Sequence, residues 1–150
     1  MVTFIKIWCR SNKTMNMKPF SDLNNKYALL DYVPTHSQLL IRSMRNRKRD
    51  YNIDIIFKPI SALNIPQFFE GMELTVLSSQ EGKRLIGEKY QFEIKKDYSV
   101  FLLQDGKKNN YFVIAMAVGV FHNKMDILET SIGPFRQASD WGTKVFWYYD

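Results

Sequence analysis

Three consecutive stretches set the local architecture of this chain: Ser37-Gln-Leu-Leu-Ile-Arg-Ser-Met44, Arg45-Asn-Arg-Lys-Arg49 and Tyr51-Asn-Ile-Asp-Ile-Ile-Phe57. In the last of them, apolar Ile53, Ile55 and Phe57 alternate with Asn52, Asp54 and Ile56, as the two faces of a strand do. A short polar connection between two strand-like runs is typical of a β-hairpin. We therefore expect a hairpin whose five-residue tip, 45–49, carries four positive charges.

A second region, 88–121, predicts three more antiparallel strands. Residues 88–95 alternate between apolar and polar side chains, which indicates a strand with one solvated face. The run 98–104 follows after a tight connection, and a turn-forming loop leads to the apolar run 111–121. Because this last run does not alternate, we expect a central strand covered on both faces, with Gly119 at a bulge or a close approach.

Further strands are expected at 2–8, 72–78, 126–132 and 143–149. Segment 21–30 is either a helix capped by Ser21 or, over 27–32, another strand, and 66–70 followed by Gly71 suggests one helical turn. The chain therefore predicts a mainly β, single-domain antiparallel barrel or sandwich of about seven to nine strands with little helix. The domain spans 1–150, with 1–20 as a candidate peripheral N-terminal segment.

Composition limits the class of protein. A hydrophobic fraction of 45% and an aromatic fraction of 15% supply enough apolar surface for a folded core. Cys9 is the only cysteine, which excludes an internal disulfide and a cysteine-based zinc site. The longest apolar run, 111–121, is too short to span a bilayer as a helix, which needs about 20 residues. With no recognisable signal peptide, we expect a soluble cytoplasmic protein, although Met15 and Met17 leave the native start open.

The positive charge is concentrated early in the chain. The net charge is +6, yet residues 1–49 hold ten Lys/Arg against two Asp/Glu, and the remainder is slightly acidic. Five of those ten cations lie between Arg42 and Arg49. A basic region of this kind favours contact with anionic groups, although solvated surface charge gives the same pattern.

The hairpin tip gives the leading functional hypothesis, a binding module for an anionic partner. Its candidate partner-binding residues share the tip or flank it: Arg42, Arg45, Arg47, Lys48, Arg49 and Tyr51. Arginine forks bind carboxylate or phosphate, and a tyrosine can stack on a base. Both an acidic protein and a nucleic acid therefore fit. A homo-oligomer through the aromatic stretch Phe146–Tyr149 is a further option.

The alternative hypothesis is a β-barrel with an internal cavity that binds a small ligand or performs acid–base catalysis. Its weak candidate residues are Glu88, which shares strand parity with apolar residues, and the two histidines, His36 and His122. His36 follows Thr35 and precedes Ser37, but no Gly-x-Ser-x-Gly elbow occurs. Glycine-rich phosphate-binding fingerprints are also absent. The sequence thus favours a binding module over an enzyme, and predicts no cofactor and no metal site.

Overall fold

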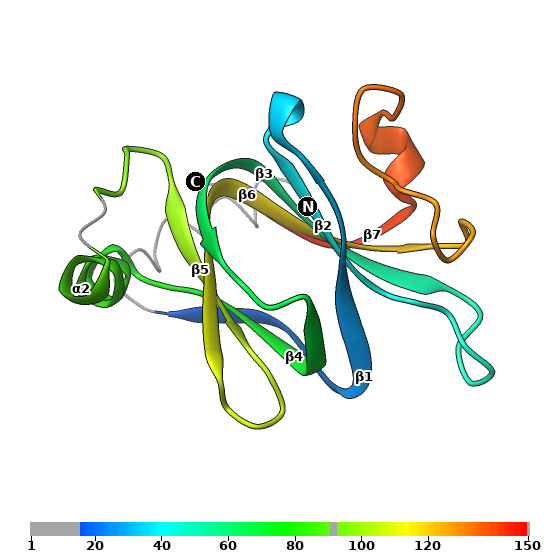
Figure 1. Ribbon diagram of the computed structural model, residues 1–150, viewed down its shortest axis with the longest axis horizontal. Coiled ribbons are helices and arrows are strands. Elements are labelled where there is room, and N and C mark those ends of the chain that lie inside the picture. The colour runs from blue at the N-terminus through cyan, green and yellow to red at the C-terminus, as the bar shows by residue number, and fades with distance from the viewer. Residues whose placement is uncertain (1–15, 91–92, 150) are drawn as a thin grey trace.

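The computed structural model describes residues 16–90 and 93–149 and is mainly β (Figure 1). Its strands are β1 (Met17–Val33), β2 (Gln38–Ser43), β3 (Asn52–Asn64), β4 (Phe68–Val76), β5 (Ser99–Gln104), β6 (Asn110–Asn123) and β7 (Thr143–Tyr149). Helix α2 (Ser79–Lys89) and two short 3-10 turns, η1 (Pro34–His36) and η2 (Ala138–Trp141), complete the regular structure of these residues. No helix in this described part of the chain is both long and apolar enough to cross a bilayer.

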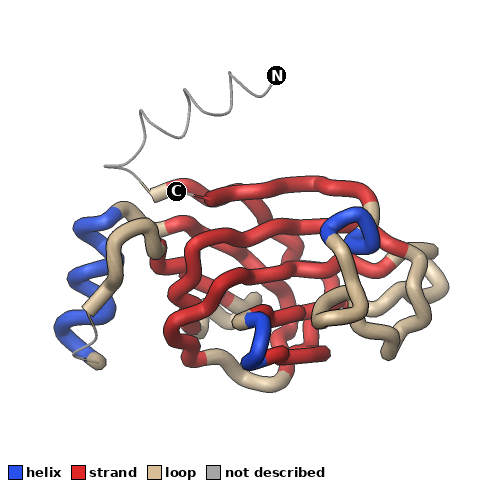
Figure 2. The backbone as a smooth tube through the Cα atoms, turned by 90° about the horizontal axis from the view of Figure 1, so that it is seen from above, coloured by secondary structure: helices blue, strands red, loops and turns tan. Residues whose placement is uncertain are grey.

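The strands pair antiparallel in one sheet that closes into a ring. The order is β3-β2-β1-β4-β5-β6-β7, and a further pairing joins β3 to β6. Strand β6 pairs with β3 along one edge, and along its other edge it pairs first with β5 and then with β7. Figure 2 shows the strands side by side around the ring. The prediction of a mainly antiparallel β fold with little helix is confirmed.

Apolar side chains fill the interior of the ring. Ile53, Ile55 and Phe57 of β3 point into this core, as their alternation predicted. They meet inward residues of the other strands, including Tyr27, Leu39, Ile41, Phe69, Met72, Leu74, Val76, Phe101, Leu103, Val113, Ala115, Val118 and Val120. The opposite face of β3 carries Asn52, Asp54 and Ile56, which are nevertheless buried. Another part of the chain therefore covers the outer face of β3 as well.

Two covers lie on the outside of the ring. Helix α2 packs Ile86 against Val100, Phe112 and Ile114 of β5 and β6. The segment 124–142 places Ile132 and Trp141 over Leu40, Ile56 and Phe121. Strand β6 is therefore covered on both faces, which confirms the expectation for 111–121 and explains why that run lacks alternation.

Gly119 lies at a close approach between β6 and β7, opposite Trp147. A Cβ atom built at this glycine would lie 2.5 Å from ring carbons of both Phe121 and Trp147. The register between β6 and β7 also shifts between Val120 and Phe121. Both observations agree with the close approach or bulge that Gly119 predicted.

The strand predicted at 88–95 is wrong. Residues 79–89 form α2, whose N-terminus is capped by the Ser78 hydroxyl, which accepts a hydrogen bond from the backbone N–H of Glu81 at 3.3 Å. Residues 93–98 form no strand, and 91–92 lie outside the described residues. The meander is instead β4-β5-β6, with the helix inserted after β4. Burial of Ile86 against β5 selects the helix over the local alternation.

Three other local expectations also change. Segment 21–30 is part of β1, so the strand alternative over 27–32 is confirmed and the helix capped by Ser21 is wrong. Pairing with β2 on one edge and β4 on the other outweighs the helix cap. Strand β4 begins at Phe68, inside the predicted helical turn 66–70. Residues 126–132 form a loop rather than a strand. The strand expected at 2–8 lies outside the described residues, and the last residues of the candidate peripheral segment 1–20 belong to β1.

Candidate binding site at the β2–β3 hairpin

The turn between β2 and β3 is closed by its own hydrogen bonds. The two strands pair from Leu39 opposite Phe57 to Ser43 opposite Ile53, so the predicted hairpin is confirmed. At the tip, Asn46 and Arg49 exchange backbone hydrogen bonds of 2.8 and 3.2 Å. The Asn46 side-chain oxygen also accepts from the backbone N–H groups of Lys48 at 2.8 Å and Arg49 at 3.1 Å. These bonds fix the backbone on which the tip cations stand.

Arg42 is not available to a partner, contrary to its inclusion among the binding residues. Its side chain is fully buried, and its Nε and Nη2 donate to the two carboxylate oxygens of Asp54 at 2.6 and 2.8 Å. Register explains this placement, since Arg42 and Asp54 stand opposite each other on neighbouring strands. The bidentate pair replaces the water that a surface arginine would bind.

Asp54 is the centre of a buried polar cluster. Its Oδ2 also accepts from Asn123 Nδ2 at 2.7 Å and from the Ser131 hydroxyl at 2.8 Å. Asn52 extends the cluster by donating to the Asn123 side-chain oxygen at 3.0 Å. Sequence reasoning missed this cluster. The sequence does place Asn52 and Asp54 on the strand face opposite the apolar residues. Their partnership with Arg42 can be recognised only once the register of β2 against β3 is known.

Arg42 also fixes the loop after β6. Its Nη1 donates to the carbonyl oxygens of Asp126 and Ile127, each at 3.2 Å, and to that of Glu129 at 2.6 Å. Asn52 adds a bond from its Nδ2 to the Met125 carbonyl at 3.0 Å. The buried side chains of Arg42 and Asn52 therefore hold the backbone of 125–129 against the hairpin.

Two other tip arginines are partly occupied within the protein. Arg45 donates to the Lys124 carbonyl at 3.0 Å and lies 3.5 Å from a carboxylate oxygen of Asp126. Arg49 donates from its Nη2 to the backbone oxygens of Ser43 and Met44 and to the Ser43 hydroxyl, at 2.9–3.0 Å. Arg49 therefore braces the turn, whereas Arg45 keeps a third of its side chain exposed.

Tyr51 and His122 form a stacked pair beside the tip. Their ring centroids are 4.2 Å apart, and the Arg49 guanidinium lies 5.5 Å from the centre of the Tyr51 ring. Partial burial, reinforced by the nearby charge of Arg49, lowers the pKa of His122 below its ordinary value. The Tyr51 ring is therefore already engaged within the protein.

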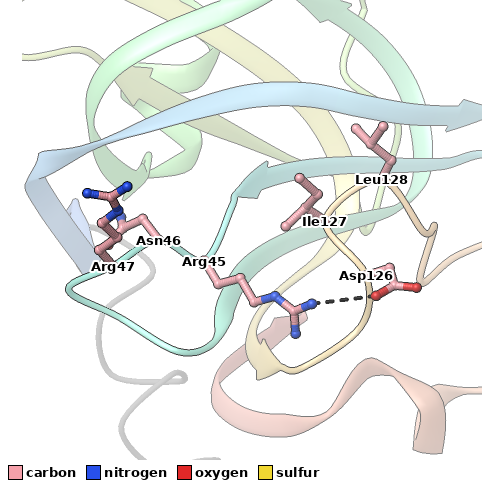
Figure 3. Close-up of a pocket in the computed structure, with 6 residues that line it drawn as sticks. All are labelled: Arg45, Asn46, Arg47, Asp126, Ile127 and Leu128. Carbon is pink, nitrogen blue, oxygen red and sulfur yellow. Dashed lines mark hydrogen bonds and ion pairs between the residues drawn. The ribbon is translucent and has the colours of Figure 1, made fainter.

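Arg47 and Lys48 are the free cations of the hairpin. Both are exposed, and neither side chain forms an ion pair or a hydrogen bond with any residue in the described ranges. Beside them lies an open pocket, lined by Arg45, Asn46, Arg47, Asp126, Ile127 and Leu128. Figure 3 shows Arg45 extending towards Asp126, with Ile127 and Leu128 on the loop that faces the hairpin.

The catalytic candidates do not meet. His36 is exposed in η1, at the start of β2, and its Nδ1 lies 3.1 Å from the Thr35 hydroxyl. His122 pairs with Ile53, which lies beside the last residue of β2, so the two histidines are at opposite ends of that strand. Glu88 belongs to the last turn of α2, which covers the outside of the ring. Among the described residues, no three His, Cys, Asp or Glu side chains gather as metal ligands.

The hairpin tip and the loop 125–129 thus offer cations on a fixed backbone beside exposed aliphatic side chains. Such a surface can attract carboxylate or phosphate and can cover apolar groups, but it contains no nucleophile–base pair. No protein-family model, curated protein or solved structure matches this chain. The geometry of this site is therefore the basis for a function.

Proposed function

We propose that this protein is a binding module that recognises an anionic partner through the tip of the β2–β3 hairpin. The observation that carries the proposal is the pair Arg47 and Lys48, two exposed cations without a counter-charge among the described residues, on a turn fixed by Asn46. Binding to a rigid turn costs less ordering entropy than binding to a flexible one. Arg45, at the edge of the pocket, supplies a third cation.

An acidic protein segment fits this surface better than a nucleic acid does. Tyr51, the aromatic ring expected to stack on a base, is stacked on His122 instead. Exposed carboxylates also interrupt the basic surface, since Asp50 pairs with Lys124 at 2.9 Å and Asp126 is 90% exposed. A phosphate backbone needs a longer row of cations than these residues provide.

The alternative of a cavity-bearing barrel receives no specific support. Apolar side chains occupy the interior of the ring, and Glu88 lies on a helix outside it. His36 is exposed, and His122 is engaged with Tyr51. A binding surface on the hairpin therefore accounts for more of the observations than a catalytic interior does.

The test compares two double variants with equal loss of charge. Arg47→Ser/Lys48→Ser removes the free tip cations, whereas Lys95→Ser/Lys96→Ser removes two exposed cations beyond α2. Binding to poly-L-glutamate and to a single-stranded oligonucleotide is measured by titration at low and at physiological salt. We expect the tip variant to lose about tenfold in polyglutamate affinity, because two lost exposed charge contacts together contribute about 1.4 kcal/mol. Equal binding by both variants and the native protein would contradict the proposal.

A further inference from the structure

We infer that the partner is an acidic protein segment that also places an aliphatic side chain in the pocket between the hairpin tip and loop 126–128. This inference rests on the proposed function and adds the apolar half of the recognition. One wall of the pocket is Arg45–Arg47 and the other is Asp126–Leu128. The two walls come from segments about 80 residues apart in the chain, such as Arg45 and Asp126.

The apolar wall of the pocket is exposed to solvent. Ile127 is 42% exposed and Leu128 is 73% exposed, although they are adjacent large aliphatic residues. Two neighbouring aliphatic side chains that face water on a fixed loop mark a surface that a partner covers. Isolated exposed leucines are common in proteins, so exposure alone does not indicate a binding surface. The argument for a binding surface here is that the backbone carrying these two residues is fixed.

The loop cannot easily turn these side chains inward. The carbonyl groups of Asp126, Ile127 and Glu129 accept hydrogen bonds from the buried guanidinium of Arg42. These bonds fix the loop backbone in the arrangement that leaves the Leu128 side chain exposed. The Thr130 hydroxyl, which donates to Asp31 at 2.6 Å, anchors the next part of the loop. A pocket wall held in this way is preorganised, which reduces the entropy lost on binding.

Charge complementarity completes the description of the partner. Arg45 and Arg47 stand at the rim of the pocket, and the carboxylate that pairs with Arg45 is that of Asp126, 3.5 Å away and 90% exposed. An exposed pair with this geometry is weak, so a partner carboxylate can displace Asp126 at little cost. A peptide with an aliphatic residue flanked by glutamate or aspartate fits both features, whereas a nucleic acid leaves Ile127 and Leu128 uncovered.

The experiment uses synthetic glutamate-rich peptides as probes. One series carries a single leucine, scanned through the central positions, and the reference peptide carries serine instead. Binding to the full-length protein is measured by calorimetry, and we expect the best leucine peptide to bind about tenfold more tightly than the serine peptide. In Leu128→Ser this preference disappears while affinity for the serine peptide is unchanged. The matched control, Leu23→Ser, alters another exposed leucine, on β1, and keeps the preference.

The outcomes separate this inference from the proposed function. Equal affinity for leucine and serine peptides, combined with loss of both in Arg47→Ser/Lys48→Ser, would overturn the inference and leave an anionic partner in place. Binding of an oligonucleotide but of neither peptide would also overturn it, in favour of a nucleic acid. Unchanged affinity in Arg47→Ser/Lys48→Ser would overturn both. Thermal unfolding of each variant confirms that a changed affinity does not reflect a lost fold.

Discussion

At the scale of single residues, Arg42 shows how a cation can be misread from sequence. It belongs to the basic stretch before the hairpin tip, yet its guanidinium bonds to Asp54 and to three loop carbonyls, and none of it is exposed. Burying an ion pair has a large desolvation cost, which only good geometry and extra hydrogen bonds offset. The gain here is specificity, because a single side chain fixes β3 and the loop after β6 in one arrangement.

The buried pair predicts that removing Asp54 destabilises the protein far more than removing an exposed carboxylate does. Asp54→Ala leaves the Arg42 guanidinium buried without a counter-charge. It also removes the acceptor of the Ser131 hydroxyl and the shorter of two bonds from Asn123 Nδ2. We expect the free energy of unfolding to fall by about 3–5 kcal/mol, measured by urea denaturation. Asp50→Ala, which breaks an exposed pair with Lys124, serves as the control and should leave the midpoint unchanged. Similar losses in both variants would show that Asp54 is not the centre of the cluster.

His122 predicts a pH dependence of stability. Its pKa is lowered from 6.5 in the folded protein, mainly by partial burial and further by Arg49. Below about pH 6.5 the unfolded chain therefore binds a proton at His122 more readily than the folded protein does. The free energy of unfolding is highest above about pH 6.5 and falls as the pH drops below it. His122→Phe keeps a ring against Tyr51 and removes this titration. Unfolding midpoints between about pH 7.5 and pH 5.5 should therefore fall less in the variant than in the native protein.

His36 is present in both proteins, so the difference between their pH profiles reports His122 alone. Parallel profiles would show that protonation of His122 costs the folded protein nothing, and that its stacking on Tyr51 tolerates the charge.

At the scale of elements, the sequence predicted strands well where both partners of a pair alternate or are wholly apolar. The hairpin formed by β2 and β3 and the central strand β6 follow directly from such patterns. Helix α2 was missed because the alternation at 88–95 is local, whereas the docking of Ile86 on β5 is tertiary. The same limit affected β1, whose form depends on pairing with β2, which follows it directly, and with β4, which is distant in sequence.

The candidate site was predictable only in part, for the same reason. The exposed cations Arg47 and Lys48 follow from the position of the turn, which local patterning reveals. The apolar wall of Ile127 and Leu128 depends on where a loop about 80 residues away returns to the hairpin. That return is set by Arg42 and Asp54, whose partnership requires the register of β2 against β3.

Two glycines predict opposite effects on the elements that contain them. Gly119→Ala places a methyl group 2.5 Å from ring carbons of Phe121 and Trp147, so β6 and β7 must separate, at a cost of about 1–3 kcal/mol. Gly87→Ala, in helix α2, meets no atom within 4 Å and should instead stabilise the protein by about 0.5–1 kcal/mol. Equilibrium denaturation of the two variants checks both signs. A neutral Gly119→Ala would mean that the two rings repack without loss.

At the scale of the whole molecule, the early cations that lie within the described residues do not all become part of one basic surface. Lys18 pairs with Glu73 at 2.9 Å, Arg42 is buried, and Arg49 braces the turn. Only Arg47 and Lys48, with part of Arg45, remain available at the hairpin tip. Within the described residues, the hairpin tip therefore carries a small group of exposed cations on a fixed turn and not an extended basic surface.

The closed ring and its outer cover also predict how the molecule unfolds. Trp141 and Trp147 stack at 5.9 Å in the outer cluster, which shares Leu40, Ile56 and Phe121 with strands of the ring. In a Trp8→Phe/Trp147→Phe background, the fluorescence of Trp141 therefore reports the cover, while far-UV circular dichroism reports the strands of the ring. Because Arg42 ties the cover to β2 and β3, we expect the two urea transitions to coincide in the native protein.

Arg42→Met removes the pair with Asp54, which weakens ring and cover alike, and it also removes the three bonds to loop carbonyls, which hold the cover alone. The backbone pairings of the ring stay in place. The fluorescence transition should then move to lower urea than the circular dichroism transition, because the cover loses its anchor before the ring opens. Gly87→Ala, in a helix far from this cover, should keep the two transitions together. If Arg42→Met shifts both transitions equally, ring and cover unfold as one unit through the apolar cluster around Phe121, and the anchoring role assigned to Arg42 is wrong.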